Sequence, residues 1–288
     1  WDFVGSNNIP LLSQKGQFGS RCAWGRDAAN TRYSGTTLEE ITEYIFRKED
    51  MDLLTYIKGE DDYIEPEYYV PILPMVLVNG IRAGIGTGWS SKVPAYNPLD
   101  ILKCLKVWIT NNLDKGERLD DKIFLSDLPE ISPWYHGFEG EIIRQKVHQY
   151  STYGVIISHS DTVKEVTELP IGMSTDSFRD KLKLLRAEEK ILDFNDYCSK
   201  TKVRFVITEH PDKMICDVKT LGLSKSVATS NMVGFDSEGK IKKYDCIDEI
   251  IYDFANVRIK LYQKRKDFLI KSLDEKIILN TSKRRFVE

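Results

Sequence analysis

The chain lacks the features of a membrane protein and of a zinc-binding protein. No stretch approaches about 18 consecutive apolar residues, so we expect no segment to span a membrane. The five cysteines are odd in number and include no Cys-x-x-Cys pair, which favours a reducing compartment and argues against a zinc site. The four histidines are scattered without metal-ligand spacing. We therefore expect no zinc site on this chain.

Two other patterns fall short of a ligand site. The glycines of Gly84-x-Gly86-x-Gly88 do not have the G-x-G-x-x-G spacing, and the residues that follow do not open a helix, so a nucleotide-binding loop is not expected. The carboxylates of Glu60-Asp61-Asp62 are adjacent and have polar flanks, so they should point in different directions. We interpret that cluster as a solvated loop.

The composition is that of an ordinary globular chain. Of its 288 residues 30% are charged and 41% are apolar, which is enough to build real cores, and the length predicts about two domains. The chain starts at Trp1 without an initiator methionine, and we interpret it as a segment of a longer protein.

The adjacent residues Arg32 and Tyr33 are the most informative feature of the sequence. A tyrosine hydroxyl has a pKa of roughly 10, so it becomes a nucleophile only when a base or a cation assists it. The guanidinium of Arg32 is permanently charged and fits phosphate oxygens. The pair can attack a phosphodiester if Tyr33 lies at the end of an element, and Ser34-Gly35 supplies such an end.

The runs around this pair resemble the end of the winged-helix domain of eukaryotic-type topoisomerase II, a type IIA DNA topoisomerase. The resemblance continues to the end of the chain. The runs that carry it are Phe3-Val4-Gly5-Ser6-Asn7-Asn8, Gly16-Gln17-Phe18-Gly19-Ser20-Arg21, Arg26 to Tyr33, Ile64 to Gly80, Gly84-Ile85-Gly86-Thr87-Gly88-Trp89-Ser90, Gly239 to Tyr244 and Tyr262 to Lys266.

The resemblance implies an enzyme. It implies a homodimer that passes one DNA duplex through a transient double-strand break in another, with Tyr33 as the nucleophile of a 5′-phosphotyrosyl link and Arg32 as the group that stabilises the transition state. It also implies that Mg²⁺ and ATP are bound by other domains of the full protein and not by this segment. The histidine that assists the nucleophile in the family lies upstream of this chain, so we assign no general base here.

Ile85 is the second candidate, because it is the only bulky aliphatic residue in the glycine-rich loop that runs from Gly84 to Gly88. An apolar wedge between base pairs costs a few kcal/mol of unstacking but allows a bent duplex to touch more protein. The matching isoleucine of the family intercalates. The lead-in to this loop, Ile81-Arg82-Ala83, is one residue longer than the corresponding segment of the family. The chain also departs from cellular enzymes around Cys22-Ala23-Trp24 and Ser34-Gly35. The last two departures suggest a large DNA virus as the source, which would place the protein in a cytoplasmic factory of the host and not in the nucleus.

Charge is unevenly distributed although the net charge is only −3. Residues 1–35 carry +2, residues 36–65 carry −7 and residues 240–288 carry +5, so double-stranded DNA should avoid the second segment. We expect contacts to the DNA backbone from seven cations: Lys15, Arg21, Arg26, Lys92, Lys240, Lys242 and Lys243.

The predicted fold class is α+β. We expect the C-terminal part of a winged-helix domain over residues 1–46, a tower domain with an antiparallel sheet and the DNA-bending loop over residues 47–245, and the start of a coiled-coil arm toward an exit gate over residues 246–288. The expected helices begin at the capping box Thr37-Leu38-Glu39-Glu40, at Asn97-Pro98, at Thr175 and near Ile247, the last exceeding 35 residues. The expected strands are a meander of Glu141 to Ile143, Val155 to Ile157 and Val163 to Thr167, the strand Lys202 to Thr208, and a hairpin of Met232 to Phe235 with Ile241 to Tyr244.

Two other interpretations compete with a type II topoisomerase. One is a noncatalytic scaffold that bends DNA with Ile85 and the basic surfaces but does not cut it. The other is a tyrosine recombinase or type IB enzyme, which would form a 3′-phosphotyrosyl link and would need an array of several catalytic Arg and His residues. The sequence shows no such array.

Overall fold

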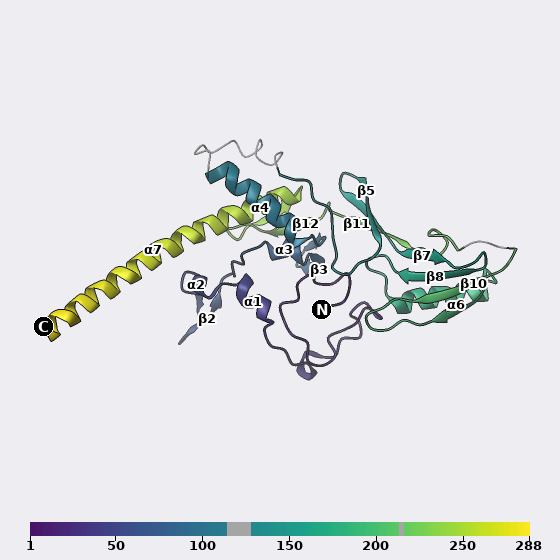
Figure 1. Cartoon of the computed structure of the whole chain (residues 1–288), viewed down its shortest axis with the longest axis horizontal. Coiled ribbons are helices and arrows are strands. Elements are labelled where there is room, and N and C mark those ends of the chain that lie inside the picture. Colours follow the sequence, from purple (N-terminus) through teal and green to yellow (C-terminus); the bar gives the residue numbers. More distant parts are fainter. Residues whose placement is uncertain (114–127, 213–215) are drawn as a thin grey trace.

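The computed structural model describes residues 1–113, 128–212 and 216–288. It has a body of several small antiparallel sheets and a helix that projects from it (Figure 1), which confirms the α+β class. The helices are η1 (Thr31–Tyr33), α1 (Glu40–Ile45), α2 (Lys48–Met51), α3 (Met75–Val78), α4 (Pro98–Leu113), α6 (Thr175–Ala187) and α7 (Ile247–Val287). The strands are β1 (Tyr56–Lys58), β2 (Tyr63–Pro66), β3 (Ile81–Gly86), β4 (Trp89–Val93), β5 (Glu141–Lys146), β6 (Gln149–Tyr153), β7 (Val155–Ser158), β8 (Val163–Glu168), β9 (Ile191–Asp196), β10 (Phe205–Glu209), β11 (Ser224–Ala228), β12 (Met232–Phe235) and β13 (Ile241–Tyr244).

The lobe at the right of Figure 1 is a four-stranded antiparallel sheet, in the order β7-β8-β10-β9, with α6 packed against it. The buried face of α6 carries Phe178, Leu182 and Leu185, which recur at helical spacing. The helix begins where the sequence predicts, because the Ser174 hydroxyl accepts a hydrogen bond of 3.1 Å from the Ser177 amide.

The predicted meander is wrong, because its strands belong to two sheets. β7 and β8 form a hairpin in the four-stranded sheet, whereas β5 pairs with β6 in a second sheet of order β11-β6-β5. The sequence concealed β6, since its buried side chains are Tyr150 and Thr152 and not an aliphatic run. The chain changes sheets at Gly154, where a Cβ would lie only 2.4 Å from the Glu168 carbonyl oxygen.

The central core joins α3, α4, the β12–β13 hairpin and the first turns of α7. Helix α4 buries Ile101, Leu105 and Trp108, whereas Leu102 and Ile109, which helical spacing also assigns to the core, are exposed. The Asn97 side chain caps this helix by accepting a hydrogen bond of 2.9 Å from the Leu99 amide. The β12–β13 hairpin has the predicted limits.

The predicted capping box at Thr37 does not form. Helix α1 begins at Glu40 without a side-chain cap. The Thr37 hydroxyl instead lies 2.6 Å from that of Ser13, and the Ser13 hydroxyl accepts a hydrogen bond from the Thr37 amide. A long-range partner therefore takes the hydroxyl that would have capped the helix.

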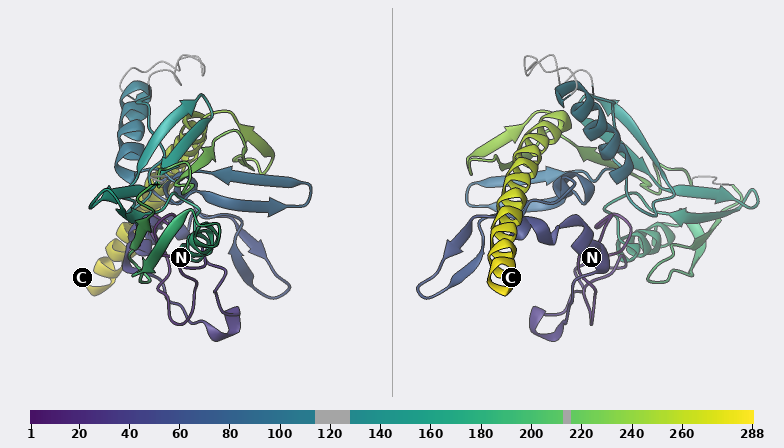
Figure 2. Two further views of the ribbon diagram at one scale, coloured as in Figure 1. Left: turned by 90° about the vertical axis from the view of Figure 1, so that its right-hand side faces the viewer. Right: turned by 60° about the vertical axis from the view of Figure 1, so that its left-hand side comes forward.

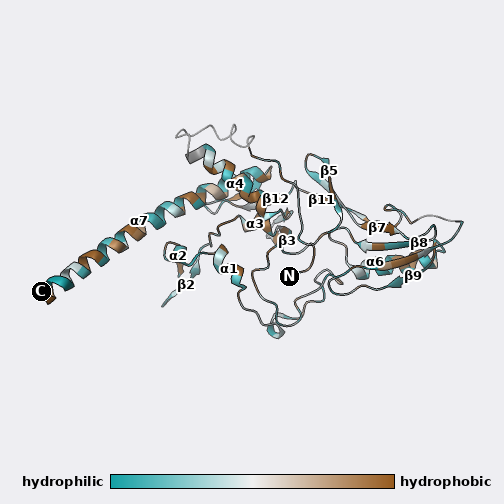
Figure 3. Ribbon diagram, in the orientation of Figure 1, coloured by the Kyte–Doolittle hydropathy of each residue, from teal (hydrophilic) through white to brown (hydrophobic). Residues whose placement is uncertain are grey.

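Helix α7 runs for 41 residues, or roughly 60 Å at 1.5 Å per residue, as the sequence predicts. It is held to the body by Asp50, which forms ion pairs of 2.7 Å with Arg258 and 3.2 Å with Arg265. Its last buried apolar residue is Leu261. Beyond that point Figure 3 shows hydrophobic bands along a helix that stands clear of the body.

Two β-hairpins extend from the body. They are β1–β2 and β3–β4, and Figure 2 shows them projecting on the same side of the molecule. The segment that ends in η1 forms an extended loop at the bottom of the same views. This arrangement presents η1 and the tips of both hairpins to solvent.

Candidate active site

Tyr33 is the last residue of the single-turn helix η1, and its side chain is 71% exposed. The guanidinium carbon of Arg32 lies 5.1 Å from the centre of the Tyr33 ring. The Asn30 side chain accepts a hydrogen bond from the Arg32 amide, and the Ser34 amide donates to the Thr31 carbonyl. Because Tyr33 is the last residue of this turn, the Arg32 side chain can curl round onto its ring, as the pair requires.

The backbone of a neighbouring segment supports the turn that carries Tyr33. Lys15 and Gly35 form an antiparallel bridge with hydrogen bonds of 3.0 and 2.8 Å. Gly16 has a φ of +107°, and a Cβ there would lie 3.1 Å from the Tyr33 carbonyl oxygen. Only glycine combines this left-handed conformation with such a close approach.

Asp27 fixes the turn that leads into η1. Its carboxylate accepts hydrogen bonds of 2.8 Å from the Ser20 amide, 2.6 Å from the Ser20 hydroxyl and 2.8 Å from the Gln17 side chain. Partial burial alone would raise the pKa of Asp27, but these donors outweigh it and hold the pKa below its ordinary value. Asp27 therefore acts as a structural anion and is poorly suited to accept the phenol proton.

Ile85 lies near the tip of the β3–β4 hairpin and is 89% exposed. It pairs with Ser90, and the turn beyond it contains Gly88 with a φ of +76°. The structure corrects the expected loop, because the glycine-rich segment is part of an antiparallel two-stranded ribbon. An isoleucine at the end of such a ribbon can enter a groove without moving its own domain.

The segment Ile81-Arg82-Ala83 contains a β-bulge. Ile81 pairs with Val93 and Gly84 pairs with Ser91, so β3 has one more residue than β4 between these two points. Strand β4 contacts the loop before β12, where the Lys92 amide donates a hydrogen bond of 2.8 Å to the Asn231 carbonyl oxygen. The hairpin is thus bulged on one strand and held on the other.

Most of the predicted backbone cations lie at the surface. Lys15, Arg26, Lys92 and Lys243 are exposed. Lys240 is exposed but forms an ion pair of 2.6 Å with Glu238. These five side chains can reach an external phosphate.

Two of the predicted cations are used within the protein. The Arg21 side chain is 5% exposed and forms an ion pair with Glu168, so its guanidinium links the N-terminal segment to β8 and cannot reach DNA. We therefore remove Arg21 from the predicted backbone contacts. Lys242 forms a 2.8 Å ion pair with Asp253 of α7, which makes it a weaker candidate.

Sequence reasoning missed Lys225 on β11. Burial, and secondarily the charge of nearby Lys92, lower the pKa of Lys225. Lys92 and Lys225 come from distant parts of the chain and belong to different sheets, so no local pattern could have joined them. Lys225 is exposed, and its ammonium also donates a hydrogen bond to the Gly172 carbonyl oxygen.

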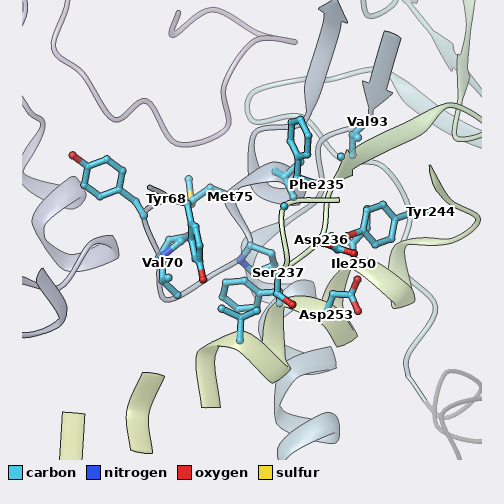
Figure 4. A pocket seen from close by; sticks show the side chains of 18 of the residues that line it. Tyr68, Val70, Met75, Val93, Phe235, Asp236, Ser237, Tyr244, Ile250 and Asp253 are labelled. Carbon is cyan, nitrogen blue, oxygen red and sulfur yellow. The ribbon is translucent and has the colours of Figure 1, made fainter. Parts of the chain in front are cut away.

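A groove of about 950 Å³ lies between the residues around Tyr68, the β12–β13 hairpin and α7 (Figure 4). Its walls are largely apolar and aromatic, and its charged lining residues are all acidic: Glu67, Asp236, Glu238 and Asp253. Carboxylates repel phosphates, so this groove is not a DNA site.

The described residues do not form a metal site. Throughout residues 1–113, 128–212 and 216–288 no group of three or more His, Cys, Asp or Glu side chains could hold an ion. Residues Glu60 to Asp62 lie in the exposed turn between β1 and β2.

Among the described helices none is long and apolar enough to span a bilayer.

Known proteins with similar sequences fall into one family. The family of the A subunit of DNA gyrase/topoisomerase IV matches residues 1–288. DNA topoisomerase 2 of Invertebrate iridescent virus 6 is 37% identical over 291 residues, which cover 99% of this chain and 24% of that protein. DNA topoisomerase 2 of Saccharomyces cerevisiae is 39% identical over 282 residues, which cover 94% of this chain and 19% of that protein.

A solved structure has the same fold. The crystal structure of the Plasmodium falciparum topoisomerase II DNA-binding, cleavage and re-ligation domain matches with a TM-score of 0.84 and 36% identity, over 95% of this chain and 36% of that one. The chain therefore spans no more than about a quarter of these two curated relatives. Because the family match extends from the first residue to the last, the chain belongs to the DNA gyrase/topoisomerase IV A-subunit family and corresponds to the cleavage region of type IIA topoisomerase II.

Proposed function

We propose that this chain is part of the DNA-binding and cleavage core of an ATP-dependent type II topoisomerase that makes a transient double-strand break. The observation that carries the proposal is the exposed Tyr33 with the Arg32 guanidinium against its ring. The relative with the similar fold is itself a DNA-binding, cleavage and re-ligation domain, which supports the same activity for this chain.

In the proposed reaction the Tyr33 oxygen attacks a backbone phosphorus, the phenol gives up its proton, and the bond from phosphorus to the 3′-oxygen breaks. The leaving 3′-oxygen takes a proton and becomes a free hydroxyl, while the 5′-phosphate stays on Tyr33. Arg32 neutralises the charge that develops on the phosphate oxygens. Phenolate is a good leaving group, so the 3′-hydroxyl can reverse the step and reseal the strand.

Mg²⁺ and ATP are implied by the family. In the described part of the chain, however, no cluster of three or more His, Cys, Asp or Glu side chains could hold a metal ion. We propose that both are bound by other parts of the full-length protein. The steps assigned to this chain are therefore limited to nucleophilic attack, charge stabilisation and DNA positioning.

Ile85 is the proposed wedge that bends the duplex. Its exposure leaves the side chain free to enter between base pairs, and the exposed Lys92 on β4 of the same hairpin can hold the backbone beside the kink. The exposed lysines Lys240 and Lys243 on the β12–β13 hairpin are proposed contacts to an arm of the bent DNA.

The proposed assembly is a homodimer. Past Leu261 helix α7 exposes an apolar series that nothing in the described chain covers: Phe268, Leu269, Ile270, Leu273, Ile277 and Ile278. A long helix with exposed apolar residues requires a partner, and a second copy of this arm would bury them. Since one nucleophile cuts one strand, two copies also supply the two nucleophiles of a double-strand break.

The relatives include a viral protein, and for a viral source we propose the host cytoplasm instead of the nucleus.

The test uses full-length protein, Mg²⁺ and duplex DNA labelled at the 5′ or the 3′ end, with detergent to trap covalent complexes. Wild-type protein should remain attached to the 5′ ends of the breaks, and Tyr33→Phe should form none. Tyr63→Phe is a matched control, because Tyr63 is also 71% exposed but lies on β2. Bending without any covalent adduct in the wild type would instead support a noncatalytic scaffold.

A further inference from the structure

Two segments that are distant in the sequence, around Trp24 and around Arg82, meet in space. Arg82 lies in the bulged part of β3, and its guanidinium carbon is 5.0 Å from the centre of the Trp24 ring. The same guanidinium lies 4.4 Å from the Trp1 ring centre and 5.9 Å from that of Phe3. Arg82 thus inserts from the wedge hairpin into an aromatic box on the N-terminal segment, formed by Trp1, Phe3 and Trp24.

The box binds the arginine by more than ring contacts. The Arg82 side chain also donates a hydrogen bond of 3.3 Å to the Trp24 carbonyl oxygen. Burial lowers the pKa of Arg82, as expected for a cation withdrawn from water, and one of its terminal nitrogens is fully buried. Because Arg82 is half-buried with its guanidinium among these rings, we assign it an internal role and not a contact to DNA.

The box itself is tightly built. The Phe3 and Trp24 rings meet edge to face, with 5.4 Å between their centres. A Cβ at Gly5 would lie 2.5 Å from the Trp24 ring, and one at Gly25 would lie 2.6 Å from the Trp1 ring. Trp24 has a φ of +56°, which is unfavourable for a bulky residue and persists only where its surroundings fix it.

The box is connected to Tyr33 by short links. The Gly25 amide donates to the Ser20 carbonyl, and Ser20 in turn donates twice to Asp27. Asp27 ends the turn of residues 21–27, and η1 begins four residues later at Thr31. On the other side, Arg82 is three residues from Ile85 on the same strand.

We propose that Arg82 is a positioning residue that fixes the wedge hairpin to the Tyr33 segment of the same chain, so that insertion of Ile85 and placement of the scissile phosphate at Tyr33 occur in one geometry. The inference rests on the proposed DNA-cleaving function. Arg82 lies in the bulged part of β3, between the pairs Ile81–Val93 and Gly84–Ser91, and from there its side chain reaches the aromatic box.

The test compares full-length wild-type protein with Arg82→Met, which keeps length and apolar contact but loses charge and hydrogen bond, and with Arg82→Lys. Two duplexes are used: one fully paired, and one with a short mismatch at the wedge step that makes it flexible. The bend is measured by energy transfer between dyes on the two arms, and cleavage is measured by trapping with detergent.

On the paired duplex Arg82→Met should lower both the bent fraction and cleavage roughly tenfold, the factor expected for a partly desolvated cation–π contact. The mismatched duplex should restore Arg82→Met to nearly wild-type cleavage, because that DNA bends at little cost. On the paired duplex Arg82→Lys should give a bent fraction and a cleavage level between those of the wild type and Arg82→Met. Arg186→Met is the matched control, since Arg186 lies 5.6 Å from the Phe194 ring on the far lobe, and it should change neither quantity.

Wild-type behaviour of Arg82→Met on the paired duplex would overturn the proposal. An equal loss on both duplexes would also overturn it, because a general folding defect is not rescued by a flexible substrate. If the wild-type protein bends DNA but never cuts it, the proposed function fails, while the bent fractions of wild type and Arg82→Met still decide the role of Arg82.

Discussion

The Arg32 guanidinium carbon lies 5.1 Å from the centre of the Tyr33 ring, on a single turn of 3₁₀ helix. This contact places a permanent cation beside the proposed nucleophile. Arg32→Gln should therefore lower the cleavage rate by roughly 10²–10³-fold, the usual cost of removing one group that stabilises developing charge. Single-turnover cleavage at saturating DNA measures this effect. Arg32→Lys should recover only part of the rate, since an ammonium lacks the planar fork.

Arg26→Gln is the control for that experiment, because Arg26 is an exposed cation of the same segment with no proposed contact to the reacting phosphate. It should weaken DNA binding modestly and leave the saturated rate unchanged. Equal losses of rate for Arg26→Gln and Arg32→Gln would show that only the overall charge of the segment matters.

Gly16 should be intolerant of substitution although it is exposed. Gly16→Ala places a methyl group 3.1 Å from the Tyr33 carbonyl oxygen at a φ of +107°, so the Tyr33 turn must shift. We expect cleavage to fall by about tenfold or more, with roughly 1 kcal/mol of lost stability. Gly86→Ala is the control, because nothing lies within 4 Å of a Cβ at that position. A Gly16→Ala protein with normal cleavage would show that the bridge from Lys15 to Gly35 does not position Tyr33.

Ile85→Ala should separate bending from stability. The side chain is 89% exposed, so its removal should change the melting temperature by little, whereas DNA bending should weaken by roughly a few kcal/mol of lost wedge contact. Energy transfer on dye-labelled duplexes and thermal unfolding are the two measurements. Ile64→Ala on β2 is the control, since Ile64 is a similarly exposed isoleucine of the other hairpin. If both variants bend DNA as the wild type does, Ile85 is not the wedge.

Stability should depend on the protonation of Asp248. Burial, and then the charges of Glu130 and Glu249, raise the pKa of Asp248 to about 6. The folded protein therefore binds this proton more tightly than the unfolded chain, whose pKa is about 4, so stability from this group is present below about pH 4 and is lost as the pH rises to about 6.

Asp248→Asn removes that dependence. At pH 7.5 it should stabilise the protein by about 1–2 kcal/mol, a value reduced for partial exposure of the carboxyl, and near pH 4 it should have little effect. Calorimetric melting at the two pH values tests this, with Asp161→Asn, at an exposed aspartate outside α7, as the control. A gain of the same size at both pH values would indicate a packing effect.

The parts of the fold that depend on local pattern were predictable from the sequence. The start of α4 after Asn97, the β12–β13 hairpin and the length of α7 follow from capping, turn residues and periodicity. The exposure of Tyr33 and Ile85 agrees with their predicted roles, which stay predictions until they are tested.

The parts that depend on distant partners were not predictable. Arg21 has the charge of a DNA contact, but its partner Glu168 is 147 residues away. Thr37 has the spacing of a cap, but Ser13 engages its hydroxyl. Gly154 sends two adjacent strands into different sheets because a carbonyl oxygen occupies the place of its side chain. Each of these outcomes was decided by tertiary contact, which overrides local preference.

The most direct test of the account is to identify the covalent bond itself. Full-length protein is trapped on DNA with Mg²⁺, the adduct is digested with protease and nuclease, and the modified peptide is sequenced by mass spectrometry. The account predicts one modified residue, Tyr33, that carries a nucleotide through its 5′-phosphate and leaves a free 3′-hydroxyl on the other DNA end. A nucleotide on another residue, or one attached through its 3′-phosphate, would contradict it.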